Sequence, residues 1–124
     1  MEKYMELMLS SLAVDEELKR DMTESLIEGK VMFYIAEKTR GIGKTTIIKY
    51  LSEAFNISVF TDNPHLYRRN KNVITKSDYL RGRRGYVLLD YNSYSKEEGE
   101  KLIETIKEMG ITPIGIMCVY GFEG

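Results

Sequence analysis

The sequence predicts a three-layer α/β domain, in which a parallel β-sheet reduced in size lies between helices and further helices precede it. Two observations support this fold class. Short apolar runs of strand length alternate along the chain with segments whose apolar residues recur at helical spacing. The chain has 124 residues, enough for one domain with one core. We expect one structural domain, made of a helical segment at 1–29 and a sheet-containing part at 30–124.

The N-terminal segment is predicted to form two helices. Asp15 is suited to cap the second helix, and Gly29 is suited to end it. The apolar residues of each helix follow a helical spacing: Tyr4, Met5, Met8 and Leu12 in the first, and Leu18, Met22, Leu26 and Ile27 in the second. Such a stripe rich in methionine and leucine is typical of a packing surface.

The first strand is predicted at Val31–Ala36, a continuous apolar run of the kind found in parallel strands that are covered on both faces. A helix is expected from Thr45, and a second short strand at Asn56–Phe60. The apolar face of that helix is predicted to comprise Ile47, Ile48, Leu51, Ala54 and Phe55.

The second half of the chain continues the alternation. Val73–Ile74 is predicted as a brief third strand, and Gly85–Asp90 as a buried strand that ends in an acid. Ser95 and Glu98 have the spacing of a capping box at the start of a further helix. Ile111–Tyr120 supplies the last strand. Strands that alternate with helices in this way favour a parallel sheet.

A glycine-rich segment, Gly41–Thr46, lies between the first predicted strand and the helix that follows it. Gly43 allows the backbone to approach a phosphate, and successive N–H groups at a helix start face its oxygens. Lys44 has the length to reach the β- and γ-phosphates, and the Thr45 hydroxyl can ligate Mg²⁺. The alternative is a surface turn with a solvated lysine. Lys38 occupies the place of the first glycine in the usual phosphate-loop pattern.

Asp90 is the expected partner of this loop. It follows four predicted strand residues, Tyr86–Leu89, which is the arrangement of a Walker B strand. An acid in that position holds a water on the Mg²⁺ ion that bridges the phosphates. The alternative is an acid at a strand end that only begins a turn.

These segments resemble P-loop NTPases, and within them the terminase large subunits that package phage DNA. Thr39–Thr46 is similar to their deviant phosphate loop, which lacks the first glycine and places an arginine where Arg40 stands. Tyr79–Asp90 is similar to the arginine- and glycine-rich stretch before their Walker B strand. The resemblance implies a P-loop NTPase core at 30–124 that binds ATP, or GTP, with Mg²⁺.

The resemblance also implies a set of site residues. The catalytic residues would be Lys44, Arg40 and Asp90, and the metal ligands Thr45 and Asp90. The residues that bind the nucleotide would be Gly41, Ile42, Gly43, Lys44, Thr45 and Thr46.

Tyr91 departs from the family pattern, which has a glutamate directly after the Walker B aspartate to orient the attacking water. Two functions therefore stay open. One is a phage-type ATPase that acts on DNA or on a DNA-processing assembly. The other is a binding or regulatory protein that keeps the fold with little or no hydrolysis. A small nucleotide kinase is a third alternative, for which no acceptor-binding or lid segment is evident.

Charge is unevenly distributed along the chain. Residues 38–84 carry 11 basic and 3 acidic side chains, a net charge of +8, whereas the whole chain has a net charge of −1. Possible contacts to DNA phosphates are Arg68, Arg69, Arg81, Arg83 and Arg84. The alternatives for these arginines are fingers that reach a neighbouring subunit's nucleotide and a solvated basic loop.

The remaining expectations concern compartment and assembly. Cys118 is the single cysteine and is predicted to be a core residue, so a disulfide framework is excluded. No apolar run has the length of a membrane span, and we expect a cytoplasmic protein, in the host cytoplasm if it is viral. A short sheet leaves unpaired strand edges, from which we expect a homo-oligomer or a complex with a larger protein.

Overall fold

The sheet is built entirely of parallel strands. The computed structural model describes residues 14–36, 43–67, 73–76, 80 and 82–121. Its strands are β1 (Val31–Ile35), β2 (Ser58–Thr61), β3 (Val73–Ile74), β4 (Gly85–Ser95) and β5 (Ile111–Gly121). They form one five-stranded sheet in the order β1-β5-β4-β2-β3, with every pair parallel. The predicted parallel α/β architecture is therefore confirmed.

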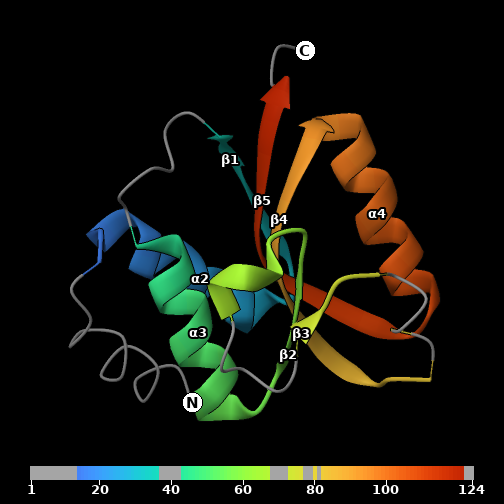
Figure 1. Cartoon of the computed structure of the whole chain (residues 1–124), viewed down its shortest axis with the longest axis horizontal. Helices are drawn as coiled ribbons and strands as arrows, with labels where there is room; N and C mark the ends of the chain where they lie inside the picture. Colours follow the sequence, from blue (N-terminus) through green and yellow to red (C-terminus); the bar gives the residue numbers. More distant parts are fainter. Residues whose placement is uncertain (1–13, 37–42, 68–72, 77–79, 81, 122–124) are drawn as a thin grey trace.

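Helices cover both faces of this sheet (Figure 1). The described α-helices are α2 (Glu16–Glu28), α3 (Lys44–Phe55) and α4 (Lys96–Glu108), and a 3-10 turn, η2 (Pro64–Tyr67), follows β2. One core cluster joins α2 and α3 to one face, and a second joins α4 to the other face. The three layers are compatible with Rossmann-like and P-loop folds. No described helix is both long enough and apolar enough to cross a membrane.

Helix α2 begins and ends where the sequence predicts. The Asp15 carboxylate accepts a hydrogen bond from the Leu18 N–H at 3.1 Å, and Gly29 ends the helix in the left-handed region with a φ of 68°. Leu18 and Met22 are fully buried against the sheet. Ile27, predicted to share that face, is instead 49% exposed. The first predicted helix lies outside the described residues.

Two boundaries near α3 differ from the prediction. Asn56, assigned to the second strand, caps the end of α3 in the left-handed region with a φ of 54°, and β2 begins at Ser58. Asparagine tolerates this conformation better than most residues, so the helix ends there. Ala54 is exposed rather than part of the apolar face. Ser52 is buried in its place, and its hydroxyl donates to the Ile57 carbonyl at 2.6 Å.

Strand β4 is longer than predicted, and Asp90 does not end it. The strand continues through Ser95 because residues after Asp90 go on pairing with β5, from Tyr91 beside Met117 to Ser95 beside Gly121. Polar residues such as Asn92 obscured this extension in the sequence. Asp90 therefore lies within the sheet, 3% exposed, and not in a turn.

Strand β1 is an edge strand. The apolar run predicted a strand covered on both faces, but all five residues of β1 are only half-buried, and among the described strands its one neighbour is β5. Gly115 allows β5 to approach β4 closely. Its φ is 106°, and a Cβ atom at this position would lie 2.5 Å from the Leu89 carbonyl oxygen. The Gly115 N–H donates a hydrogen bond to the buried Ser25 hydroxyl of α2 at 2.9 Å.

Candidate functional site at the start of helix α3

Helix α3 begins without the devices that begin the other two described helices. Its N-cap is Gly43, with a φ of 93° and no side-chain hydrogen bond, and its first turn contains no acidic residue. In α2 and α4 the caps are Asp15 and Ser95, and both first turns carry glutamates. The N-terminus of a helix carries a partial positive charge, and Lys44 adds a full one. The start of α3 is therefore a positive end that its own first turn does not compensate.

Asp90 supplies the compensating charge from the sheet. Its Oδ1 atom lies 3.0 Å from the Lys44 Nζ atom, and the two side chains are 3% and 16% exposed. Its Oδ2 atom lies 3.5 Å from the Thr45 hydroxyl. The Lys44 ammonium also donates to the Cys118 sulfur at 3.2 Å. Cys118 is fully buried, which confirms that it is a core residue, and it also lines this cluster.

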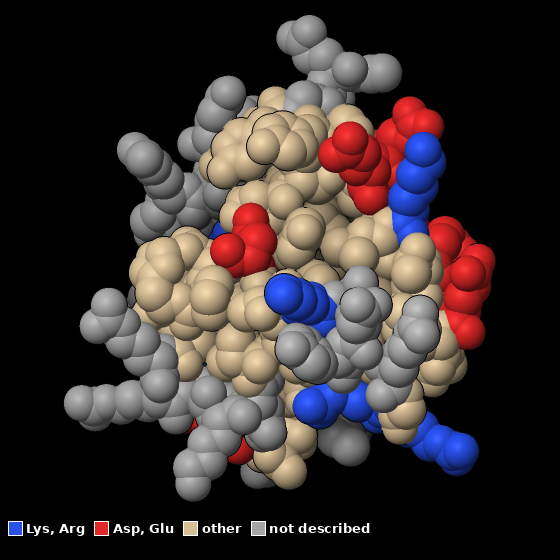
Figure 2. All heavy atoms as spheres, turned by 45° about the vertical axis from the view of Figure 1, so that its right-hand side comes forward, with Lys and Arg blue, Asp and Glu red and all other residues tan. Residues whose placement is uncertain are grey.

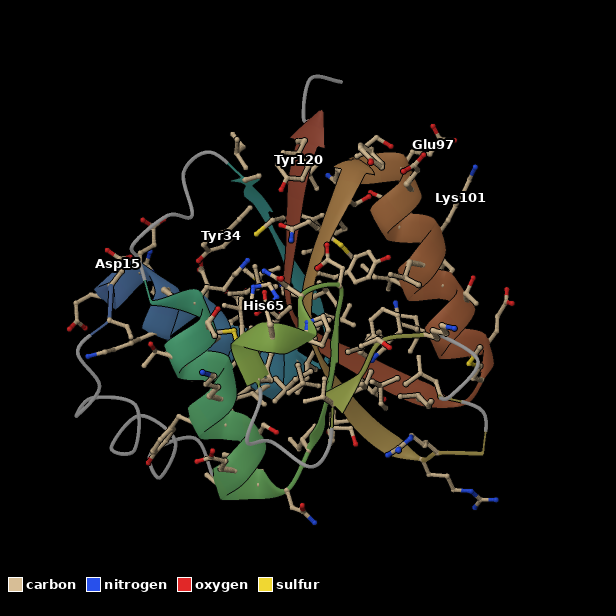
Figure 3. All side chains as sticks on the ribbon, in the orientation of Figure 1. Asp15, Tyr34, His65, Glu97, Lys101 and Tyr120 are labelled. Atoms are coloured by element: carbon tan, nitrogen blue, oxygen red, sulfur yellow. The ribbon has the colours of Figure 1, made fainter. Side chains whose placement is uncertain are left out.

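Tyr67 completes the cluster at the same Asp90 oxygen that the Thr45 hydroxyl approaches. It belongs to η2, the turn in which Figure 3 labels His65, and its hydroxyl donates to the Asp90 Oδ2 atom. The ring is 2% exposed, and the Lys49 Nζ atom lies 5.7 Å from its centroid. Sequence reasoning missed Tyr67, because the stretch after β2 has no regular pattern. The one available signal is the apolar pair Leu66-Tyr67, which begins two residues after Pro64.

The charge state of this cluster follows from its burial and its ion pair. Burial lowers the pKa of Lys44, but the Asp90 carboxylate and then the Cys118 sulfur raise it more, so the pKa lies above its ordinary 10.5. Burial, followed by the Asp90 charge, raises the pKa of Tyr67 above its ordinary 10.0. Near neutral pH, Lys44 is therefore a cation and Tyr67 a neutral hydrogen-bond donor.

Gly43 is required by the packing around it as well as by its backbone conformation. A Cβ atom there would lie 2.3 Å from the Val14 Cγ1 atom, far inside van der Waals contact. A positive φ also strains any residue that has a side chain. Val14, which precedes α2, thus packs beside this glycine.

Tyr91 points to the opposite face of the sheet from Asp90, because side chains alternate along a strand. Its ring packs against Phe60 with centroids 5.3 Å apart, in the cluster under α4. Position 91 is therefore directed away from Lys44.

The structure brings together three of the predicted site residues: Lys44, Thr45 and Asp90. Thr46 is exposed in the first turn of the same helix. Arg83 and Arg84 lie before the amino end of β4, whereas Asp90 lies five residues into that strand. The other predicted residues lie outside the described part of the chain: Arg40, Gly41, Ile42, Arg68, Arg69 and Arg81.

For a metal ion, the oxygen donors in the cluster include the Thr45 hydroxyl and the Asp90 carboxylate. Within the described residues no group of three or more His, Cys, Asp or Glu side chains is placed to hold a metal. In comparisons with known proteins, no family model, no curated protein and no solved structure matches the chain. The functional interpretation therefore depends on the geometry of the cluster and on the sequence.

Proposed function

We propose that this chain is a P-loop protein that binds a nucleoside triphosphate, ATP or GTP, together with Mg²⁺ at the start of α3. The observation that carries the proposal is the convergence of Lys44 and Thr45, from the first turn of a helix, on the buried Asp90 of β4. A lysine and a threonine that follow a strand-to-helix connection, together with an aspartate on a second parallel strand, are residue types that can bind a polyphosphate and its metal ion.

The electrostatics of the cluster support an anionic ligand. The helix start, with Lys44, presents more positive charge than the single Asp90 carboxylate offsets. Lys44 is held as a cation and is 16% exposed, so its ammonium can be shared with a phosphate. The Gly43–Thr45 segment lies where backbone N–H groups of a first helical turn have no partner within the helix.

The donor set fits Mg²⁺. This ion prefers oxygen ligands, and it is usually held by one or two side chains, by phosphate oxygens and by water. The Thr45 hydroxyl and the Asp90 carboxylate supply such oxygens, so a cluster of three acidic residues is not needed. When bound, the ion would neutralise phosphate charge. Tyr67, which donates to Asp90 Oδ2, orients that carboxylate.

The test is a calorimetric titration with ATP and with GTP, each with and without Mg²⁺. We expect saturable, Mg²⁺-dependent binding by the wild-type chain and no measurable binding by Lys44→Ala. Lys101→Ala is the matched control, because Lys101 is 75% exposed on α4 and pairs with Glu97 at 3.5 Å. Equal affinity of the wild type and Lys44→Ala would refute the assignment.

One observation favours the weakly hydrolytic alternative over a phage-type ATPase that acts on DNA. Position 91, where the family pattern has a water-orienting glutamate, holds a tyrosine whose ring packs under α4, away from Lys44. Much of phosphoryl-transfer catalysis comes from positioning and from neutralising charge, and Tyr91 supplies neither. We expect the purified chain to release phosphate much more slowly than about 1 s⁻¹, the lower end of kinase turnover. A measured turnover at or above that rate would support the ATPase.

Partners are a separate part of the proposal. DNA contacts through Arg83 and Arg84 predict an affinity that falls steeply with added salt. Association with a second copy or a larger protein predicts a mass above 14.4 kDa in light scattering, with or without Mg-ATP. A monomer under both conditions would contradict self-association, and DNA binding without salt dependence would contradict phosphate contacts.

A further inference from the structure

Two exposed tyrosines lie side by side near the carboxyl ends of β4 and β5. Ser93 pairs with Val119, and the same register holds on the far side of the next residues, so Tyr94 lies opposite Tyr120. Neighbouring strands are about 4.8 Å apart. Tyr94 is 81% exposed and Tyr120 is 59% exposed, and Figure 3 shows Tyr120 at the end of β5. These two residues, the tyrosine pair, therefore present adjacent aromatic surface to solvent.

The tyrosine pair lies on the face of the sheet that carries Asp90. Side chains alternate along a strand, so Tyr94 shares a face with Asp90, and Tyr120 shares it with Cys118. The packing agrees with this alternation, because Cys118 belongs to the core cluster under α2 and α3, whereas Val119 belongs to the cluster under α4. The tyrosine pair therefore continues the surface of the cluster at the start of α3.

The distance from that cluster to the tyrosine pair matches the length of one nucleotide. Cys118, which accepts a hydrogen bond from the Lys44 ammonium, is two residues before Tyr120, roughly 7 Å along the strand. Asp90 is four residues before Tyr94, roughly 13 Å along its strand. In a nucleoside triphosphate, the ribose and the α-phosphate separate the base from the terminal phosphates by a comparable length. Terminal phosphates held at Lys44 therefore leave the base within reach of the tyrosine pair.

Strands β4 and β5 extend beyond the strands beside them (Figure 1). β1 ends at Ile35, which pairs with Val119, and β2 ends at Thr61, which pairs with Asp90. The tyrosine pair comes after both of these positions, so it lies on a two-stranded extension of the sheet. This position accounts for the exposure of the rings and leaves them accessible to a flat ligand.

The charge on the two sides of the tyrosine pair favours one orientation of an anionic ligand. An outer surface of α4 is acidic, with four glutamates and one lysine: Glu97, Glu100, Lys101, Glu104 and Glu108. Asp and Glu side chains lie along the right-hand side of Figure 2. On the other side of the pair are Lys44 and the positive start of α3. Phosphates are therefore attracted to the α3 side, which leaves the base at the rings.

We propose that the tyrosine pair binds the base of the nucleoside triphosphate whose phosphates contact Lys44. This inference rests on the proposed nucleotide site and adds a second part to it. An aromatic ring stacks on any nucleobase, because every base has a flat π-face. The tyrosine pair therefore adds affinity for a nucleotide over inorganic polyphosphate, without selecting one base.

The first experiment compares Mg-ATP with Mg-tripolyphosphate by calorimetry on the wild-type full chain. We expect Mg-ATP to bind at least about tenfold more tightly, the effect of one stacked base. Equal affinities would overturn the role of the tyrosine pair and leave the phosphate site standing. Binding of neither ligand would instead contradict the proposed nucleotide site, and this inference with it.

Variants test where the base binds. In the double variant Tyr94→Thr with Tyr120→Thr, the affinity for Mg-ATP should fall about tenfold or more, whereas the affinity for Mg-tripolyphosphate should not change. Threonine keeps the β-branched shape that strands favour and removes the ring. The matched control is Tyr86→Thr, because Tyr86 is 52% exposed near the amino end of β4. An unchanged Mg-ATP affinity in the double variant, or an equal loss in the control, would overturn the proposal.

Amide shifts provide a readout that needs no variant. In the ¹⁵N-labelled wild type, saturation with Mg-ATP should shift the amides of Tyr94 and Tyr120. Mg-tripolyphosphate should shift the amides of Lys44 and Thr45 and leave those of the tyrosine pair unchanged. If Mg-ATP shifts the helix start but not the tyrosine pair, the base binds elsewhere and the proposal is wrong.

Discussion

The starts of α3 and α4 differ in how the unpaired N–H groups and the positive charge of a first helical turn are satisfied. At α4, the Ser95 hydroxyl accepts a hydrogen bond from the Glu98 N–H at 3.2 Å, and Glu97 and Glu98 place negative charge in the first turn. At α3, the cap is Gly43 without a side-chain hydrogen bond, and the first residue is Lys44. One helix start is therefore satisfied by its own residues, whereas the other depends on a group from outside the helix.

This difference separates a helix start that serves stability from one that is suited to a ligand. Lys44 at a helix N-terminus opposes the helix dipole, so the arrangement needs a nearby anion. Asp90 provides one within the protein, but its burial costs free energy that the ion pair only offsets. A helix built for stability alone would carry an acidic residue there, as α2 and α4 do. The cost at α3 is explained if a second anion binds.

Removing the cation at the start of α3 should have the largest effect on the free energy of unfolding. Lys44→Met leaves the Asp90 carboxylate buried without its ion pair, and we expect a loss of about 3 kcal/mol in the free energy of unfolding. Urea denaturation measures it. Lys101→Met, at the exposed ion pair with Glu97, should change the same quantity by less than about 1 kcal/mol. Similar losses for the two variants would contradict the assigned difference between the pairs.

Adding one methyl group at the cap of α3 should have the next largest effect. Gly43→Ala places a Cβ atom 2.3 Å from Val14 at a φ of 93°, so strain and overlap add, and we expect a loss of about 2 kcal/mol or more. Gly110→Ala is the matched control, with a φ of 83° and no atom within 4 Å of the added methyl group. Its expected loss is about 1 kcal/mol, from strain alone. Equal losses would show that Val14 does not constrain the cap.

High pH should reduce the stability that the cluster at the start of α3 contributes. The pKa values of Lys44 and Tyr67 are raised in the folded chain, so the folded state keeps these protons more tightly than the unfolded state. Their contribution is fully present below about pH 10 and is lost as the pH rises through the folded-state pKa values. The slope of unfolding free energy is at most about 1.4 kcal/mol per pH unit for each group.

The measurement is urea denaturation between pH 8 and pH 11. It is made in a Tyr34→Phe background, because burial and then the hydrogen bond to Asp21 also raise the pKa of Tyr34. Tyr67→Phe in that background should decline less steeply with pH. Identical slopes would mean that Tyr67 does not hold its proton through Asp90.

Removing the cap of α4 should have the smallest effect. Ser95→Ala loses the hydrogen bond from the Glu98 N–H, and we expect a loss of about 1 kcal/mol in unfolding free energy. Calorimetric titration should show the same affinity for Mg-ATP as the wild type, because the α4 cap contains no residue of the proposed nucleotide site. A weaker affinity in this variant would mean that the helix starts are coupled.

The sequence predicted the fold class and much of the local structure from short-range signals. Asp15, Gly29 and Ser95 act where helix-capping rules place them, because these rules depend on neighbouring residues alone. The edge position of β1 was not predictable in this way. An apolar run indicates a strand but does not show how many strands lie beside it. The length of β4 was missed because its last residues are polar yet pair with β5.

Three of the five residues in the cluster were predictable as parts of the site, and the other two were not. Lys44, Thr45 and Asp90 belong to local motifs, and the structure brings them together. Tyr67, in the 3-10 turn η2, contacts the Asp90 carboxylate, and Cys118, in β5, contacts the Lys44 ammonium. Nothing in the neighbouring residues of either one indicates a polar partner, because the contact depends on tertiary packing. Whether the cluster binds nucleotide stays a prediction.

The role of the buried Lys44–Asp90 pair is tested by measuring both stability and binding in one double variant, Lys44→Met with Asp90→Asn. The asparagine oxygen still accepts from Tyr67, and no buried charge is left without its ion pair. If the buried pair serves a ligand, the double variant should unfold within about 1 kcal/mol of the wild type, and calorimetry should detect no binding of Mg-ATP. A double variant that binds Mg-ATP as tightly as the wild type, or is as unstable as Lys44→Met alone, would contradict the account.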